Sequence, residues 1–249
     1  MEKQKQKIKN ENELEYKKKE NEYKLTNDFL DCITNDIDII YLTNPSNPIG
    51  QCIDDSLLIK ILQKAKKCAT KILLDESFYN LSNAGLFKHT FLDNNDEFIY
   101  DNLYIVKTFT KFYAKPGIRA GYVISDKNNI NRLVRQLPEW NLSSVAERLL
   151  IAGALCLDKH LISDSINYIN SEREYLTKEL QMLVKKVYRS DTSYIFLEDD
   201  RDIYNLLLKE KILIRDCSNF EGLSKGYYRI AVRNHTDNQK LVNVLKTII

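Results

Sequence analysis

The chain has 249 residues, 43% hydrophobic and 29% charged, and its 37 Lys and Arg against 35 Asp and Glu give a net charge of +2. This balance argues against nucleic acid as a dedicated partner, because such proteins concentrate positive charge against phosphates. No apolar run approaches the roughly 20 residues of a membrane-spanning helix, and the start lacks the apolar core of a secretory signal. Five scattered cysteines and three distant histidines predict a cytoplasmic protein without a metal site.

Residues 1–25 are mostly Lys, Glu, Asn and Gln and lack apolar periodicity, which predicts a charged, poorly ordered segment. The pattern then becomes globular, with a short helix over 27–33 and a strand over 37–42. An amphipathic helix over 54–68 and a strand over 71–74 follow. Strands that alternate with a helix at this spacing predict an α/β fold whose large sheet is mostly parallel.

The rest of the chain changes from α/β to helical and then to α+β. The elements predicted there are a strand at 103–106, a strand at 119–124, helices at 129–136, 144–157 and 160–187, a strand at 193–197, a helix at 201–209, strands at 212–215 and 227–232, and a helix at 236–249. The helix from residue 160 is long enough to connect two domains. We therefore expect a large domain over 26–160 and a smaller C-terminal domain over 161–249.

The segment Asn44-Pro45-Ser46-Asn47-Pro48-Ile49-Gly50 directly follows the first predicted strand. Proline fixes φ and glycine permits positive φ, so the segment predicts a rigid turn at the carboxyl end of that strand. Ligands of open α/β sheets bind at this end. Taken alone, the pattern fits a turn that binds nothing as well as it fits a ligand site.

Two further polar groups follow the next two strands. Asp75 directly follows the strand over 71–74. A carboxylate at such a place is usually a helix cap or a solvated loop residue when it binds no ligand. Lys111 follows the strand over 103–106, with hydroxyls just before it and an arginine eight residues after it, and these are donors for a phosphate. Because parallel strands share one carboxyl edge, we expect Asn47, Asp75 and Lys111 to meet there.

The run from Thr108 to Tyr122, Thr-Phe-Thr-Lys-Phe-Tyr-Ala-Lys-Pro-Gly-Ile-Arg-Ala-Gly-Tyr, resembles the lysine motif of the aspartate aminotransferase superfamily, fold type I. The cofactor of that family is pyridoxal 5′-phosphate. The Asn-Pro turn and the strand-end carboxylate occur in the order the family requires. The positions that match the family's cofactor-binding residues are Asn47, Asp75, Thr108, Thr110, Lys111 and Arg119.

The resemblance also implies a role for each matching residue. Lys111 is the catalytic residue, which binds the cofactor covalently and moves the proton. Asp75 pairs with the pyridine nitrogen, and Asn47 donates to the phenolic oxygen. The two threonines and the arginine hold the phosphate. Many relatives carry tyrosine where this chain has Phe78, so a phenolic hydrogen bond to the cofactor is absent at that position.

Three arginines near the C-terminus, Arg215, Arg229 and Arg233, are candidate substrate-binding residues. The planar guanidinium suits carboxylate and phosphate because it bonds to both bidentately. Arg229 and Arg233 are four residues apart on a predicted strand, where even spacing places both on one face. The alternative is that their stems only cover the sheet, which applies most to Arg233.

The C-terminal segment resembles that of the L-threonine-O-3-phosphate decarboxylase branch of the family, which the lysine motif also favours; histidinol-phosphate aminotransferase, a close relative of this branch, is the alternative. The resemblance implies a small phosphorylated amino-acid substrate and, in the first case, decarboxylation to (R)-1-amino-2-propanol phosphate in cobalamin biosynthesis. Both substrates carry a phosphate, so the arginines do not discriminate between a lyase and an aminotransferase. A non-catalytic remnant is the third possibility.

Relatives place a glycine-rich turn and further strands before the Asn-Pro turn, and the 43 residues that precede Asn44 do not match them. This difference predicts an incomplete fold-type I domain, a fragment that binds the cofactor weakly or not at all on its own. It also argues against the homodimer that relatives form. The single tryptophan, Trp140, lies before a predicted helix, where we expect packing rather than a place at the substrate entrance.

Overall fold

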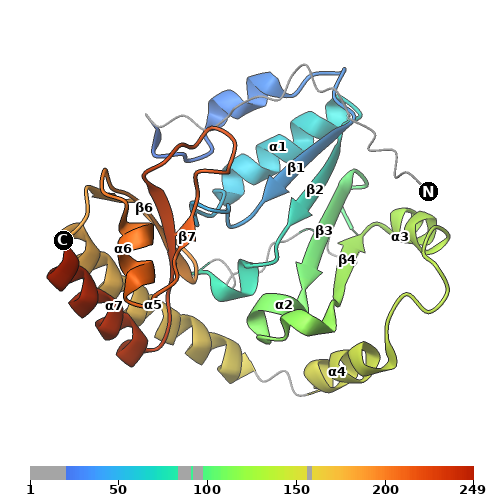
Figure 1. Ribbon diagram of the computed structural model, residues 1–249. Coiled ribbons are helices and arrows are strands. Elements are labelled where there is room, and N and C mark those ends of the chain that lie inside the picture. Colours follow the sequence, from blue (N-terminus) through green and yellow to red (C-terminus); the bar gives the residue numbers. More distant parts are fainter. Residues whose placement is uncertain (1–20, 84–90, 92–97, 156–158) are drawn as a thin grey trace, which may run out of the picture.

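The computed structural model describes residues 21–83, 91, 98–155 and 159–249, and it contains two four-stranded sheets (Figure 1). The first sheet has the order β1-β2-β3-β4. Its strands are β1 (Ile39–Thr43), β2 (Lys71–Asp75), β3 (Leu103–Thr108) and β4 (Gly121–Ser125). Strands β1, β2 and β3 are parallel and β4 is antiparallel to β3. The predicted α/β class with a mostly parallel sheet is confirmed.

Helix α1 (Asp55–Lys67) connects β1 to β2 and covers one face of this sheet. Its buried residues recur at three- and four-residue spacing, the pattern of a helix with one apolar face: Leu57, Leu58, Ile61, Leu62 and Ala65. They pack on the alternate side chains of β1 and β2 that point to the same side. On the opposite face Ile39 and Tyr41 are 61% and 57% exposed.

Six further short elements accompany the first sheet. They are the 3-10 helices η2 (Asn27–Cys32), η3 (Tyr79–Leu81) and η5 (Pro116–Ile118), and the helices α2 (Phe109–Phe112), α3 (Lys127–Val134) and α4 (Ser144–Leu155). The N-cap of α3 is Asp126, whose side chain accepts from the Asn128 amide. The lysine loop thus runs through α2 and η5 between β3 and β4, below the sheet in Figure 1.

The second sheet is antiparallel and has the order β5-β6-β8-β7. Its strands are β5 (Lys186–Val187), β6 (Tyr194–Glu198), β7 (Arg215–Asp216) and β8 (Tyr227–Ala231), and the helices α5 (Lys159–Gln181), α6 (Ile203–Lys209) and α7 (His235–Ile248) accompany it. Apolar side chains of these helices and of β6 and β8 form a separate core. Each sheet has its own core, but the domain boundary at residue 160 stays a prediction.

A third apolar cluster joins segments that are distant in the sequence. It contains Tyr23, Ile49, Tyr188, Phe196, Cys217 and Tyr227. Tyr23 is 8% exposed, and its ring contacts the rings of Tyr188 and Phe196. The structure therefore differs from the expected disorder of residues 1–25 at Tyr23, because the second sheet supplies a pocket for its ring. Residues 1–20 of that segment lie outside the described part.

Two predicted elements have different bounds. The helix predicted over 160–187 ends at Gln181, because the Lys185 amide donates to the Asp199 carboxylate and Val187 pairs with Leu197 on the sheet edge. The strand predicted over 212–215 contains only Arg215 and Asp216. Elsewhere the predicted helices and strands are present, with the helix at 27–33 formed as a 3-10 helix.

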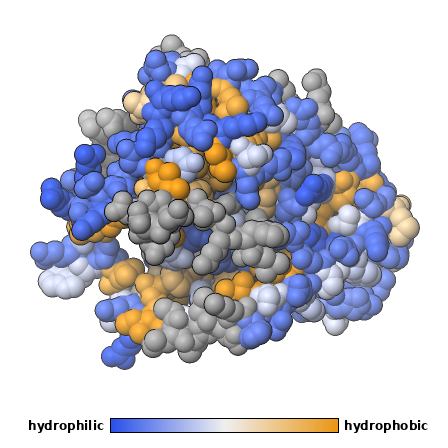
Figure 2. Space-filling view, turned by 180° about the vertical axis from the view of Figure 1, so that it is seen from behind, coloured by the Kyte–Doolittle hydropathy of each residue, from blue (hydrophilic) through white to orange (hydrophobic). Residues whose placement is uncertain are grey.

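The surface seen from behind is mostly hydrophilic, with apolar side chains in separate patches (Figure 2). Trp140 is 92% exposed, with a φ of +51°. The expected packing role for Trp140 is therefore wrong within this chain, since no described element covers its ring. None of the helices in the described part has both the length and the apolar character that a membrane crossing requires.

Candidate active site

The carboxyl ends of the three parallel strands meet as predicted. The Asn44 amide donates to the Asp75 carbonyl at 2.9 Å, and the Glu76 amide donates to the Val106 carbonyl at 2.8 Å. These two bonds extend the β1–β2 and β2–β3 pairings by one step. The Asn-Pro turn, the strand-end carboxylate and the start of the lysine loop therefore leave the sheet side by side.

The Asp75 carboxylate is fixed by three donors. Its Oδ1 accepts from the amide of Ser77 at 2.9 Å and from the Ser77 hydroxyl at 2.5 Å, and its Oδ2 accepts from the Tyr41 hydroxyl at 2.7 Å. Partial burial and this contact with the carboxylate raise the pKa of Tyr41 to about 12, so its hydroxyl stays protonated and donates. The carboxylate is thus held in one orientation.

Lys111 lies at the end of the short helix α2. Its Nζ is 5.1 Å from the centroid of the Phe78 ring, which lies in the loop after β2. No carboxylate of the described residues forms an ion pair with this amine. Lys111, which matches the family's catalytic lysine, therefore lies next to the aromatic ring of Phe78. Phe78 belongs to the loop that follows Asp75.

Asn47 contacts the second sheet. Its Oδ1 accepts from the Arg229 guanidinium at 2.5 Å, across 182 residues of sequence. The guanidinium carbon of Arg229 also lies 5.0 Å from the centroid of the Tyr194 ring. The structure thus brings Arg229, predicted to bind substrate, to Asn47, predicted to bind cofactor, and to the first-sheet edge that carries Asp75.

Arg215 is the direct partner of Arg229 in the β7–β8 pairing, so both side chains lie on one face of the second sheet. Its guanidinium donates to Asn219 at 2.8 Å and lies 5.6 Å from the Phe220 ring centroid. Like charges opposite each other destabilise a sheet when nothing neutralises them. The strand pairing thus places two cationic side chains next to each other on one face of the sheet, where they could bind an anion.

The expectation for Arg233 is wrong in its geometry. Strand β8 ends at Ala231, so the even spacing from Arg229 does not place Arg233 on the same face. Arg233 instead donates to the carboxylate of Asp237 at 2.8 Å, in the first turn of α7. An acceptor four residues later, on a helix that begins at His235, holds this side chain away from the group around Asn47.

The remaining predicted residues lie in the lysine loop. Arg119 has a φ of +55°, and its guanidinium donates to the Pro116 carbonyl at 3.0 Å within the same loop. Thr110 lies inside α2 next to Lys111. Thr108 Oγ1 is buried and has no hydrogen-bond partner among the described residues.

A cavity of about 340 Å³ lies beside this loop, lined by Glu76, Ser77, Asn80, Lys107, Thr108, Phe109, Phe112, Tyr113 and Tyr122. Two of these residues form a buried ion pair at its wall, with Lys107 Nζ 2.8 Å from Glu76 Oε2. Thr108 belongs to the lining, so the unpartnered hydroxyl and the cavity are in the same place.

Two residues of this region were not identified from the sequence. Tyr41 lies on β1, and the parallel register places its side chain on the same sheet face as that of Asp75. The predicted parallel pairing of these two strands could therefore have identified Tyr41 as a neighbour of Asp75. Tyr194 begins β6, and its hydroxyl donates to the Ser46 carbonyl at 2.7 Å. That contact joins residues 148 positions apart, and no local pattern predicts it.

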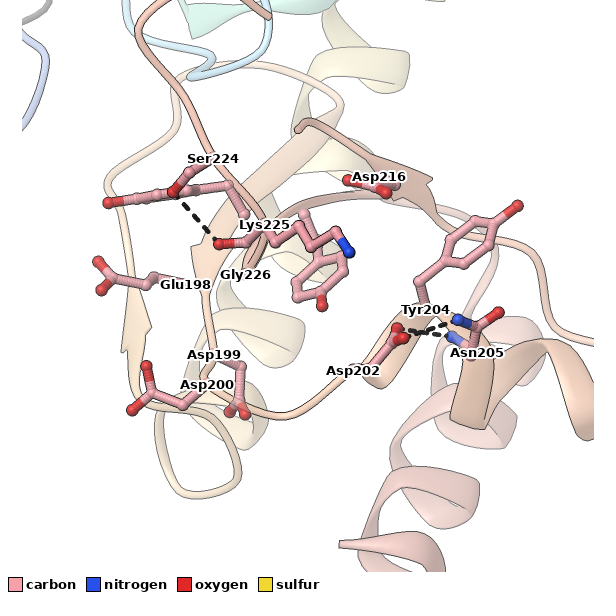
Figure 3. Close-up of a pocket in the computed structure, with 12 residues that line it drawn as sticks. Glu198, Asp199, Asp200, Asp202, Tyr204, Asn205, Asp216, Ser224, Lys225 and Gly226 are labelled. Atoms are coloured by element: carbon pink, nitrogen blue, oxygen red, sulfur yellow. Dashed lines mark hydrogen bonds between the residues drawn. The ribbon is translucent and has the colours of Figure 1, made fainter. Parts of the chain in front are cut away.

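A larger cavity, of about 540 Å³, lies on the second sheet (Figure 3). Most of its charged groups are carboxylates, of Glu198, Asp199, Asp200, Asp202 and Asp216. Each of these carboxylates accepts from a nearby donor of the chain. Glu198 accepts from Tyr188 and Lys185, and Asp199 accepts from the backbone and side chain of Arg201. Asp200, Asp202 and Asp216 accept from Lys185, Asn205 and Ser218 in that order. Local structure explains this acidic group without a ligand, and it lies apart from the lysine loop.

No group of three or more metal-ligating side chains occurs among residues 21–83, 91, 98–155 and 159–249.

The family model of class I and II aminotransferases matches residues 12–248. The chain belongs to this family. The resemblance deduced from the motifs is therefore confirmed, and the family's cofactor is pyridoxal 5′-phosphate.

The chain is similar to members of both branches. It is 30% identical over 239 residues to threonine-phosphate decarboxylase of Salmonella typhimurium, covering 93% of this chain and 63% of that protein. It is 30% identical over 214 residues to histidinol-phosphate aminotransferase of Caldanaerobacter subterraneus, covering 85% and 57%. The crystal structure of histidinol-phosphate aminotransferase from Clostridium acetobutylicum superimposes with a TM-score of 0.79 at 28% identity, over 91% of this chain and 68% of that one.

The chain thus spans about three fifths of the length of these two curated relatives. The shared part contains both sheets, since the structural match covers nearly all of this chain. Family membership and the fold follow from these comparisons.

Proposed function

We propose that this polypeptide acts in a pyridoxal 5′-phosphate-dependent enzyme whose substrate is a small phosphorylated amino acid. The observation that carries the proposal is the contact between Arg229 and Asn47, with Arg215 opposite Arg229 on the sheet. The Arg229 guanidinium thereby contacts the turn that leaves the first sheet beside Asp75 and the loop of Lys111, and this contact supports the proposal. An anionic substrate and the family's cofactor require such a combination.

Three features of the chain fit the cofactor. The Asp75 carboxylate is held in one orientation by Ser77 and Tyr41. A fixed carboxylate suits the acceptor that the N–H of the cofactor's pyridine ring requires. Thr108 Oγ1 is a buried donor without a partner. The amine of Lys111 forms no ion pair with the described residues. When bound, the cofactor supplies an electron sink for the carbanion at the substrate Cα.

The roles of the chain's own residues follow from these positions. Lys111 holds the cofactor and moves the proton at Cα, and Asp75 holds the ring nitrogen. Asn47 donates through Nδ2, because its Oδ1 accepts from Arg229. Thr108, with Thr110 and Arg119 from the same loop, holds the cofactor phosphate.

Arg215 and Arg229 hold the anionic groups of the substrate, whereas Arg233 has no part in this proposal, because it pairs with Asp237. The arginines also decide which bond at Cα breaks. A guanidinium that holds the side-chain phosphate leaves the carboxylate free to depart as CO₂, whereas one that holds the carboxylate leaves the Cα–H bond to break. We favour decarboxylation of L-threonine O-3-phosphate, the cobalamin-biosynthesis reaction, which the similarity of the C-terminal segment and the Salmonella relative support.

Transamination of histidinol phosphate is the second candidate, and the structural match to an enzyme of that name favours it. A third candidate is a member of the family without catalysis, which the second experiment below tests. The doubt about the homodimer that relatives form and the cytoplasmic location both remain predictions.

The first experiment tests cofactor binding independently of turnover. The chain is incubated with pyridoxal 5′-phosphate, reduced with borohydride, and digested for peptide mass spectrometry. We expect the label on Lys111 and its loss in Lys111→Ala, with Lys115→Ala, an exposed lysine of the same loop, as the matched control. A label spread over many lysines and unaffected by Lys111→Ala would contradict the proposal.

The second experiment separates the reactions. CO₂ release from L-threonine O-3-phosphate is compared with glutamate formation from 2-oxoglutarate and histidinol phosphate. If either activity is present, Arg229→Ala is expected to raise the KM about 10- to 150-fold, the loss of one hydrogen bond to a charged group. A chain that is labelled at Lys111 but catalyses neither reaction would support the remnant.

A further inference from the structure

Tyr194 is the residue that connects the two halves of the candidate site. It lies at the start of β6 in the second sheet and is 3% exposed. Its hydroxyl donates to the carbonyl of Ser46, which immediately precedes Asn47. Burial raises the pKa of Tyr194, so the hydroxyl remains protonated and the hydrogen bond persists throughout the physiological range.

The Tyr194 ring contacts both Arg229 and Phe78. The Arg229 guanidinium lies 5.0 Å from the ring centroid, within the range of a cation–π contact. The Phe78 ring meets the Tyr194 ring edge to face at 5.1 Å, and Lys111 Nζ lies 5.1 Å from the centroid of Phe78. The contacts therefore run from Arg229 through two rings to the amine.

The position of Tyr194 is itself closely fixed. A Cβ on Gly50 would lie 3.1 Å from Tyr194 Cε2, so the ring packs directly against the end of the Asn-Pro turn. The Tyr194 carbonyl accepts from the Ser190 hydroxyl at 2.5 Å. The ring and the hydroxyl are both held, so a guanidinium resting on the ring is held as well.

We propose that Tyr194 is a positioning residue, which holds the Arg229 guanidinium beside Asn47 and thereby sets the affinity of the site for the anionic group of the substrate. This inference rests on the proposed function for the role of Arg229. It goes further by naming the side chain that fixes the distance between the substrate-binding arginine and the turn that carries Asn47.

The hydroxyl and the ring have separable contributions. The hydroxyl fixes the ring to the turn, whereas the ring supports the guanidinium. Tyr194→Phe removes only the bond to Ser46, and Tyr194→Leu also removes the surface under Arg229. A packing role alone would change stability in both variants without any link to Arg229.

The experiment measures binding of inorganic phosphate and of L-threonine O-3-phosphate by calorimetry to the full chain and its variants. We expect Tyr194→Leu to weaken binding about three- to thirtyfold, the range that a cation–π contact allows. Tyr194→Phe should lie within about threefold of the wild type, since the ring rescues the guanidinium. Thermal unfolding identifies any variant that fails to fold, and Tyr194→Met, which also removes the ring, then replaces Tyr194→Leu.

The decisive comparison uses Arg229→Ala as a second background. If Tyr194 acts through Arg229, then Tyr194→Leu has no further effect on anion binding once the guanidinium is gone. An equal loss in both backgrounds, or none in the wild-type background, would overturn the inference. Where Tyr194→Leu does not fold, Tyr194→Met is compared in the same two backgrounds, and an equal loss in both has the same meaning.

The outcomes also separate this inference from the proposed function. Phosphate binding that depends on Tyr194, in a chain that takes no label at Lys111, would overturn the cofactor proposal and leave Tyr194 in its role. If Lys111 is labelled but anion binding does not change in the Tyr194 variants, the role of Tyr194 is overturned and the cofactor proposal stands. A wild-type chain that binds neither anion would overturn the role of Arg229 and of Tyr194 together.

Discussion

The turn after β1 offers a quantitative test at Gly50. Its φ is +90°, a region that side chains rarely adopt, and an added Cβ would lie 2.6 Å from Ser190 Oγ and 3.1 Å from Tyr194 Cε2. Strain at such a φ costs about 1–3 kcal/mol, and overpacking costs about another 1–3 kcal/mol. Gly50→Ala should therefore lower the free energy of unfolding by about 2–6 kcal/mol, a large share of the total for an ordinary protein.

The neighbours cannot easily yield to the new methyl group. The Ser190 hydroxyl donates to the Tyr194 carbonyl and also accepts from the Thr192 amide, so moving Oγ breaks two hydrogen bonds. The Gly50 carbonyl accepts from the Asp191 amide at 2.8 Å, which links the turn to the segment before β6. The substitution is thus expected to disturb the junction of the two sheets.

The control is Gly117→Ala in the lysine loop, because a Cβ there meets nothing within 4 Å and needs no positive φ. Urea unfolding of both variants, followed by circular dichroism, gives the two free energies. Gly117→Ala should stay within about 0.5 kcal/mol of the wild type or be slightly more stable. Adding Ser190→Ala to Gly50→Ala should restore part of the loss. If Gly50→Ala differs from Gly117→Ala by less than about 1 kcal/mol, the reasoning is refuted.

Three further predictions concern single groups. Burial acts to raise the pKa of Asp199, but hydrogen bonds from Arg201 and the Lys185 amide outweigh it and lower the pKa below 3.8. Its stabilisation is present above pH 3.8 and is lost as the pH falls through the lowered value. Asp199→Asn should therefore be less stable by about 1.5–3 kcal/mol at pH 7, a gap that closes in acid. An unchanged gap at low pH would contradict this. Burial first and the Asp75 contact second raise the pKa of Tyr41 from 10.0 to about 12, so stability relative to Tyr41→Phe should fall as the pH rises from 10 to 12. Equal pH profiles would exclude the contact. Acrylamide should quench the fluorescence of Trp140, the only tryptophan, nearly as well as that of a free tryptophan amide, and Trp140→Phe should change stability by less than about 0.5 kcal/mol. Protection from quenching would show that another surface covers it.

The sequence predicted most of the first sheet and its edge. Alternating strands and a helix require parallel pairing, and parallel strands have their carboxyl ends in common. Asn47, Asp75 and Lys111 each follow such an end, so their approach to one edge follows from chain order. The bounds of the 160–187 helix were wrong, because the acceptor for the Lys185 amide is a carboxylate 14 residues later.

The geometry of the arginines depended on the exact end of a strand. A single residue decides whether even spacing continues, and β8 ends at Ala231, two residues before Arg233. The carboxylate of Asp237 then competes for that guanidinium. The periodicity of one strand cannot predict that the Arg233 guanidinium finds its acceptor on the following helix.

What the sequence by itself determined is the chemistry of the parts, because residue type and spacing along one strand or turn are local properties. It specified a lysine loop, a strand-end carboxylate, a rigid turn and a set of arginines. Only the tertiary structure decided that Arg229 reaches Asn47, that Tyr41 holds Asp75 and that Tyr194 joins the two sheets. Those contacts bridge 34 to 182 residues. Tyr41 reaches Asp75 across two neighbouring strands of the first sheet, whereas the other two contacts depend on how the two separate sheets pack.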